Sequence, residues 1–200
     1  MRGSIIIVSF FIVGVIVGRF IEMPAFITEH DPTLYALYLL MFLVGMSIGS
    51  DKKALQAMKQ QNLKIILVPL GTILGTLAGS ALISFAVHGR SITDCLAVGA
   101  GFGYYSLSSV FITQYKGAEL GTIALVSNII REIITLLAAP LLVRYFGKLA
   151  PISAGGATTM DTTLPVISKY AGKEFVVISI FHGMAVDFCV PFLVTFFCTI

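Results

Sequence analysis

The chain has 200 residues, of which 57% are hydrophobic and only 12% are charged. Because soluble domains carry about 25% charged residues, this composition excludes a water-soluble enzyme domain. The formal net charge of +3 gives no indication of nucleic-acid binding. Apolar segments long enough to cross a hydrocarbon layer of roughly 30 Å recur from end to end. We therefore expect one all-α membrane domain over residues 1–200, a polytopic transmembrane helical bundle with about six hydrophobic segments.

The first two predicted helices cover residues 4–21 and 33–49. The N-terminal stretch is not expected to be a cleaved signal peptide, because Arg19 and Glu22 follow it without a small-residue cleavage site. The connector between the two helices is acidic, whereas residues 51–64 contain four lysines. Since cytoplasmic loops of membrane proteins are enriched in Lys and Arg, we expect residues 51–64 inside and the acidic connector outside.

The third predicted helix covers residues 63–87 and carries a glycine at every fourth position, at Gly71, Gly75 and Gly79. This spacing makes one helix face nearly flat. Inside lipid, such a face allows another helix to approach closely and gain van der Waals contact. We therefore expect this face to be a site of close helix packing.

The segment at about 92–114 is less regular. It begins with a capping-box pattern, Ser91 to Asp94, and three of the five residues from Gly99 to Gly103 are glycine. Each glycine costs about 1 kcal/mol relative to alanine inside a helix. The run therefore predicts a helix that unwinds.

A fifth helix is predicted at 118–143 and a final one at 174–199, the latter interrupted by Pro191. Between them, residues 149–168 are too apolar for an ordinary loop and too rich in Gly, Thr and Pro for a plain spanning helix. We expect this segment to be broken or re-entrant. Irregular backbone at membrane depth is tolerated only where it is buried in protein or lines a water-filled cavity.

Charge placement provides a test of these segments. The cations that follow the fifth helix should face the cytoplasm together with the lysines of 51–64; they are Arg144, Lys148, Lys169 and Lys173. Three intervening hydrophobic segments would place the two groups on opposite sides. The conflict disappears if 92–114 is re-entrant or broken, or if 149–168 crosses the membrane.

The fifth helix contains four polar residues, Asn128, Arg131, Glu132 and Thr135, at the spacing i, i+3, i+4, i+7. This spacing places them on one face of a helix. A charge at the bilayer centre costs about 2.5–3.5 kcal/mol on insertion scales, so Arg131 and Glu132 require a reason to be there. They form either a structural ion pair or the charged lining of a substrate or proton path.

Asp161 is the second candidate. It follows a Gly-Gly pair and is surrounded by threonines, including Thr158, Thr159 and Thr162. An unwound segment of this kind offers carbonyls, hydroxyls and one carboxylate, and secondary carriers build cation sites near the membrane midplane in this way. The alternative interpretation is a turn outside the membrane, with Asp161 capping a helix.

The final helix carries His182 and Asp187. Five residues apart, they lie about 140° apart around a helix and cannot both face one narrow pore. His182 is either a proton shuttle, since the reference pKa of histidine is near 6.5, or a hydrogen-bonded contact between helices. Asp187 either lines the pathway or lies toward the interface. The three cysteines have no metal-like spacing, and we predict no metal and no cofactor.

Four polar-rich runs, at residues 101–109, 117–136, 148–165 and 174–183, resemble the lysine exporter LysO family of bacterial inner membranes. The resemblance implies lysine export that requires membrane-embedded acidic residues, and the matching positions are Glu132 and Asp161. Longer members of this family carry additional N-terminal helices. Either the short chain works alone or as a homo-oligomer, or a separate small membrane protein supplies the missing helices.

These observations lead to the hypothesis of a multi-pass inner-membrane exporter, not an enzyme, that exchanges L-lysine and toxic lysine analogues for protons. Glu132 and Asp161 would bind either a proton or an ammonium group, and Arg131 would hold the carboxylate of the substrate or tune Glu132. The expected partners are lysine, protons and the lipid bilayer, without nucleic acid. An inorganic-cation/proton antiporter or channel that uses the same carboxylates is the alternative. An intramembrane hydrolase that uses a serine with His182 is a third hypothesis.

Overall fold

The computed structural model describes residues 13–14, 16–20, 35, 39, 42, 46, 63–87 and 89–200. The chain divides into two compact units, Met1–Ile48 and Gly49–Ile200. The predicted helices at 4–21 and 33–49 lie mostly outside the described residues, and the described positions within both ranges are helical. Residues 51–62 of the predicted lysine loop also lie outside them.

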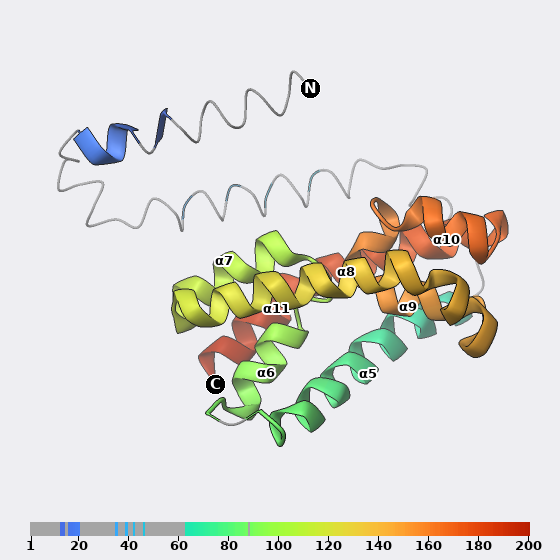
Figure 1. The fold of residues 1–200 in the computed structure, drawn as a ribbon, viewed down its shortest axis with the longest axis horizontal. Coiled ribbons are helices and arrows are strands. Elements are labelled where there is room, and N and C mark those ends of the chain that lie inside the picture. Colours follow the sequence, from blue (N-terminus) through green and yellow to red (C-terminus); the bar gives the residue numbers. More distant parts are fainter. Residues whose placement is uncertain are drawn as a thin grey trace. The chain divides into compact units, whose positions relative to one another are not determined.

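The described part of the second unit contains only helices and their connections, which confirms the predicted all-α class (Figure 1). In chain order the elements are η1 (Leu63–Ile66), α5 (Leu67–Ser84), α6 (Ile92–Gly99), α7 (Tyr105–Lys116), α8 (Ala118–Phe146), α9 (Ala150–Gly155), η2 (Gly156–Met160), α10 (Leu164–Tyr170), η3 (Lys173–Phe175) and α11 (Val176–Thr199).

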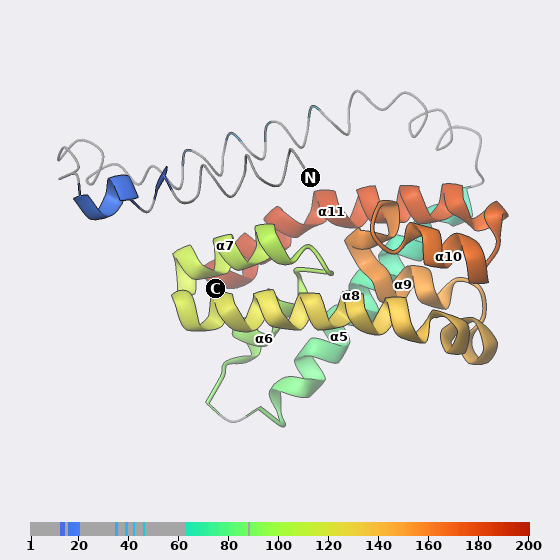
Figure 2. The same ribbon diagram turned by 45° about the horizontal axis from the view of Figure 1, so that its top comes forward.

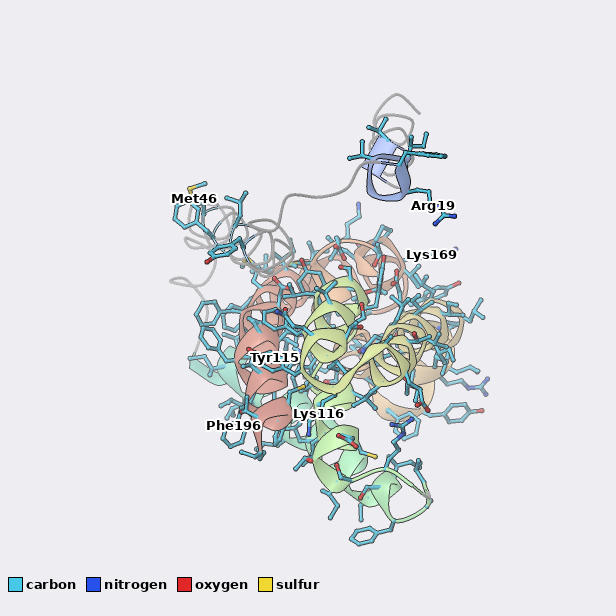
Figure 3. All side chains as sticks on the ribbon, turned by 90° about the vertical axis from the view of Figure 1, so that its left-hand side faces the viewer. Arg19, Met46, Tyr115, Lys116, Lys169 and Phe196 are labelled. Atoms are coloured by element: carbon cyan, nitrogen blue, oxygen red, sulfur yellow. The ribbon has the colours of Figure 1, made fainter. Side chains whose placement is uncertain are left out.

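Three of these helices, α5, α8 and η3–α11, are long and apolar enough to cross a membrane. Their outward surfaces display large apolar side chains: Leu74 is 68% exposed, Leu137 is 76% exposed and Phe196 is 54% exposed. Figure 3 shows Phe196 on the outside of α11. Apolar surface of this kind is unfavourable in water but favourable against lipid tails, so these helices have the surface of a membrane protein.

Helices α6 and α7 form the first broken element. The predicted capping box is present, because the Ser91 hydroxyl accepts the Asp94 N–H while the Asp94 carboxylate accepts the Ser91 N–H. The Asp94 carboxylate also lies 3.6 Å from the ammonium of Lys116, the last residue of α7 (Figure 3). The start of α6 therefore lies beside the end of α7. The chain enters, unwinds at residues 100–104 and returns to the same end, as a re-entrant hairpin.

A second re-entrant hairpin consists of α9, η2 and α10. At its base, the Lys148 ammonium lies 3.0 Å from the Glu174 carboxylate, which brings together the residues that precede and follow the hairpin. Arg90 pairs with Glu119 at the start of α8, whereas Lys148 follows the end of α8. The two hairpins therefore enter from opposite ends of a helix that is about 43 Å long, as Figure 2 shows for α6–α7 and α9–α10.

The charge conflict in the sequence is resolved by this arrangement. A buried cluster of Ile152, Ile167 and Ala171 contacts Val68 near the start of α5 and Val143 near the end of α8. Because α6–α7 returns to its own end, α5 and α8 together lead back to the starting side. The cations Arg144, Lys148, Lys169 and Lys173 consequently lie at the end where α5 begins, which is the end that residues 51–62 precede in sequence.

Close helix packing at the glycine face of α5 stays a prediction, because most of residues 1–62 lie outside the described part of the chain. A Cβ added at Gly71, Gly75 or Gly79 would meet nothing within 4 Å among the described residues, so this face of α5 is open there. The close approach of α5 and α6 uses Gly99 instead, where a Cβ would clash with Ser80.

The predicted interruption of the last helix was wrong, because α11 continues through Pro191. Proline has no N–H, however, so the Asp187 carbonyl loses its usual helical hydrogen bond.

Candidate functional site

The two re-entrant hairpins meet at their tips, backbone against backbone. The Ala157 N–H donates to the Phe102 carbonyl over 2.9 Å. A Cβ at Gly156, whose φ is +65°, would lie 1.9 Å from that same carbonyl oxygen. Only glycine permits this approach. The glycines at the two tips therefore allow the unwound segments to contact each other near the middle of α8 and α11.

Asn128 of α8 supports the first tip. Its Oδ1 accepts the Gly103 N–H over 2.7 Å, and its Nδ2 donates to the Ala124 carbonyl over 2.9 Å. The side chain is 3% exposed. Buried polar groups must be paired, and here the pairing is to freed backbone. Asn128 was predicted to line the path, and the structure uses its amide chiefly to hold the tip.

Arg131 supports the second tip. Its Nε donates to the Ala154 carbonyl over 2.7 Å and its Nη2 donates to the Ser153 carbonyl over 3.0 Å. Both carbonyls belong to the last turn of α9, where a cation is favourable because helix C-termini carry partial negative charge. Among the described residues Arg131 forms no ion pair, with Glu132 or otherwise.

Three carboxylates converge on one small cavity of about 140 Å³ beside the tip contact: Glu132 from α8, Asp161 from the second tip and Asp187 from α11. The remaining lining is contributed by both tips: Gly103, Tyr104, Tyr105, Ser106, Ala157, Thr158, Met160 and Thr162. Within the described part of the chain, no Lys, Arg or His lines this cavity. A cavity with three carboxylates and no basic side chain favours cations.

The three carboxylates differ in depth. Asp161 is exposed, and its Oδ1 accepts the Thr162 N–H and hydroxyl. Glu132 is half-buried, whereas Asp187 is only 4% exposed and its Oδ1 has no hydrogen-bond partner among the residues that the structure describes. Asp161 is not the N-cap of α10; that position belongs to Thr163, which makes no side-chain cap.

The threonines near Asp161 have two tasks. Thr158 and Thr162 line the cavity. Thr159 is fully buried and does not, since its hydroxyl donates to the Gly156 and Ser179 carbonyls over 2.7 and 2.9 Å. Thr159 therefore fixes the second tip to α11.

His182 is fully buried away from the cavity. Its Nε2 lies 2.9 Å from the Thr72 hydroxyl of α5, and its Nδ1 lies 3.2 Å from the Thr159 hydroxyl. Of the two interpretations of His182, these contacts match a hydrogen-bonded link between helices. Asp187 faces the cavity instead, as expected for two residues about 140° apart.

Two further hollows lie along Arg131. One, of about 430 Å³, extends toward Arg90 and Asp94, and the other, of about 540 Å³, lies along the open glycine face of α5. Glu132 lines neither of them. Consecutive helix residues point about 100° apart, so Arg131 and Glu132 place opposite charges in different cavities.

Residues 8–198 match the protein family described as Lysine exporter LysO. The chain belongs to this family. It is 33% identical to "Lysine exporter LysO" of Escherichia coli strain K12 over 163 residues, which are 82% of this chain and 54% of that protein. It is 32% identical to "Putative lysine exporter" of Haemophilus influenzae over 195 residues, 96% of each chain. No solved structure matches it. The chain thus spans about half the length of the Escherichia coli relative.

Several residues of this LysO-family cavity were not found from the sequence. Tyr104, Tyr105 and Ser106 directly follow the glycine run, and Met160 directly precedes Asp161. In the sequence, these residues are marked only by their position next to a segment that is predicted to unwind. Glu132 and Asp161, the positions implied by the family resemblance, both lie in the cavity.

Proposed function

We propose that this chain is a multi-pass carrier, with residues 1–200 as one transport domain, that exports L-lysine across the bacterial cytoplasmic membrane in exchange for protons. The observation that carries the proposal is the convergence of three carboxylates, without a basic side chain, where two re-entrant tips meet. Secondary carriers build midplane sites from such discontinuous helices. The names of both relatives support lysine as the substrate.

The charge of lysine favours exchange. Lysine carries one net positive charge at neutral pH, and moving it outward against 100 mV, inside negative, costs about 2.3 kcal/mol. That cost corresponds to about a fiftyfold opposing gradient. Exchange of one lysine cation for one proton moves no net charge and removes the cost. A carboxylate that binds a proton or an ammonium, but not both, couples the two movements.

Glu132 and Asp161 are the proposed ammonium-binding carboxylates because they are the accessible members of the cavity. Arg131 lines the 430 Å³ hollow, and its Nη1, which has no hydrogen-bond partner among the described residues, is the proposed donor to the carboxylate of the substrate. The 140 Å³ cavity is smaller than the 300–1,000 Å³ or so of typical ligand pockets. Lysine binding therefore requires the two tips to separate.

Orientation follows from the basic residues. Arg144, Lys148, Lys169 and Lys173 lie at the end where α5 begins, and by the positive-inside rule this end faces the cytoplasm. The 430 Å³ hollow extends from Arg131 toward the opposite end, at Arg90 and Asp94. It is therefore the proposed exit side.

A further part of the proposal concerns a partner protein, because one relative is longer than this chain. The Escherichia coli relative is longer, whereas the Haemophilus influenzae relative has nearly the same length. A second copy of the chain or a small membrane protein would supply additional helices, and the open face with Gly71, Gly75 and Gly79 offers a flat surface for them.

One observation favours a second candidate, an inorganic-cation/proton antiporter or channel. A cavity of about 140 Å³ accommodates a small cation with a few waters, since each water occupies about 30 Å³ in the liquid. Transport of sodium or potassium without transport of lysine would establish this alternative. Among the described residues, His182 contacts two threonine hydroxyls and no serine hydroxyl, so these contacts do not favour the hydrolase hypothesis.

The test is lysine efflux from cells that lack their own exporter and are fed a lysine-containing dipeptide. Wild-type chain should accelerate lysine release, and Glu132→Gln and Asp161→Asn should abolish it. Glu119→Gln is the matched control, because Glu119 lies on the same helix as Glu132 but pairs with Arg90 at the surface. Release at the wild-type rate by well-expressed Glu132→Gln and Asp161→Asn variants would refute the assignment.

A further inference from the structure

Asp187 is the deepest of the three cavity carboxylates, and among the described residues it has no hydrogen-bond or ion-pair partner. It is 4% exposed, and its Oδ1 is buried without a hydrogen bond. Pro191 additionally deprives the Asp187 carbonyl of its helical donor. An ionised carboxylate in such surroundings loses hydration without compensation, which is strongly unfavourable. The site is therefore stable only when a positive charge accompanies the carboxylate.

In the described part of the chain, the groups that face Asp187 supply no such charge. Tyr104 and Tyr105 come from the first tip, Glu132 comes from α8 and Asp161 comes from the second tip. His182 and Arg131 lie outside this lining. The missing positive charge must come from solution.

A proton fits this position better than an ammonium group. The buried Oδ1 has almost no surface that an alkyl ammonium could reach, whereas Asp161 is exposed and Glu132 is half-buried. A proton needs no cavity volume and no further ligands. A metal cation would need several oxygen ligands around the same atom, and no second oxygen bonds to Oδ1 among the described residues.

We propose that Asp187 carries the exchanged proton, while Glu132 and Asp161 bind the ammonium of the substrate; this inference rests on the proposed function. With the cavity empty of substrate, the Asp187 carboxyl group is protonated and neutral. When lysine enters from the cytoplasm, its ammonium supplies the positive charge and the Asp187 proton leaves to the cytoplasm. After lysine is released outside, an outside proton binds the Asp187 carboxylate and restores the neutral acid.

The experiment uses the full chain in liposomes and compares wild type with Asp187→Asn, which imitates the protonated acid. Two modes are measured: exchange of external for internal lysine at equal pH, and lysine movement driven by a pH gradient. Asp187→Asn should retain lysine–lysine exchange and lose the response to pH. Because it would move lysine without a proton, a clamped potential of 100 mV should then drive about a fiftyfold lysine gradient. Wild type should not respond to that potential.

Each outcome decides the question. Retained pH coupling in Asp187→Asn, or loss of its lysine–lysine exchange, would overturn the assignment of the proton to Asp187. A wild-type chain that is driven by sodium and not by pH would overturn it as well. A wild-type chain that exchanges no lysine would instead refute the proposed function. Glu174→Gln, at an exposed ion pair with Lys148, is the control and should behave as wild type.

Discussion

The tip crossing makes a sharp prediction for Gly156→Ala. At φ +65° and ψ −129° this position is in a glycine region of the backbone map, and a side chain there costs about 1–3 kcal/mol. The added Cβ would also lie 1.9 Å from the Phe102 oxygen. To relieve that clash the tips must separate, which breaks the hydrogen bond from Ala157 to Phe102 and leaves two buried groups unpaired, at about 1–3 kcal/mol.

Gly147→Ala is the matched control for this variant. Gly147 has φ +89° and ψ 173°, so an alanine there is strained as well, but its Cβ would meet nothing within 4 Å. Both variants have the cost of placing an alanine at positive φ, but only Gly156→Ala adds a clash with the Phe102 oxygen. The difference should be about 2 kcal/mol, which for a chain of this size corresponds to about 4–8 °C in unfolding midpoint.

The assay is the midpoint of thermal unfolding in detergent, followed by lysine efflux for each variant. Gly156→Ala should unfold at the lower temperature and transport poorly, whereas Gly147→Ala should transport normally. If Gly156→Ala is as stable as Gly147→Ala and transports normally, the tips do not meet through these backbone atoms.

Three further predictions follow from the same contacts. Arg131→Lys should reduce lysine efflux at least tenfold, which corresponds to about 1.4 kcal/mol. The reason is that one ammonium cannot reproduce the planar donors that hold the end of α9. Efflux at the wild-type rate would contradict this. His182→Gln should leave both the efflux rate and its pH dependence unchanged, since a glutamine amide can contact both threonine hydroxyls; a shifted pH profile would restore the proton-shuttle interpretation. Asp94→Cys with Lys116→Cys, in a chain whose native cysteines are replaced, should be linked by a short bifunctional thiol reagent, whereas failure to link would argue against the first hairpin.

The breaks were predictable because glycine and threonine act locally. The three glycines from Gly99 to Gly103 weaken a helix whatever surrounds it, and the charge of the flanking loops required at least one irregular segment. Neither signal could show that both segments are re-entrant hairpins. That depends on contacts between distant residues, such as Asp94 with Lys116 and Lys148 with Glu174.

The sequence identified candidate residues because charged side chains are unfavourable inside an apolar helix. It did not predict what each of these residues contacts. A charge inside an apolar helix is conspicuous, so Arg131, Glu132 and Asp187 could be named from the sequence alone. Their neighbours could not, because helix spacing gives a face but not the segment that packs on it. The four polar residues expected on one face therefore have different roles. Glu132 lines the cavity, whereas Asn128 and Arg131 each support one tip. The Thr135 hydroxyl donates to the Arg131 carbonyl over 2.9 Å.

Under the proposed function, the separation of opposite charges into different cavities also bears on how lysine binds. Lysine has both ammonium groups and a carboxylate, yet the 140 Å³ cavity presents only carboxylates, and the guanidinium of Arg131 faces the other hollows. A bound lysine that satisfies both signs must therefore reach from the 140 Å³ cavity to a hollow lined by Arg131. The tips are joined by the hydrogen bond from Ala157 to Phe102, and breaking it costs about 1–3 kcal/mol when both buried groups stay unpaired. Under the proposed function, the ion pairs that lysine gains with the carboxylates and with Arg131 must therefore outweigh this cost for the tips to open.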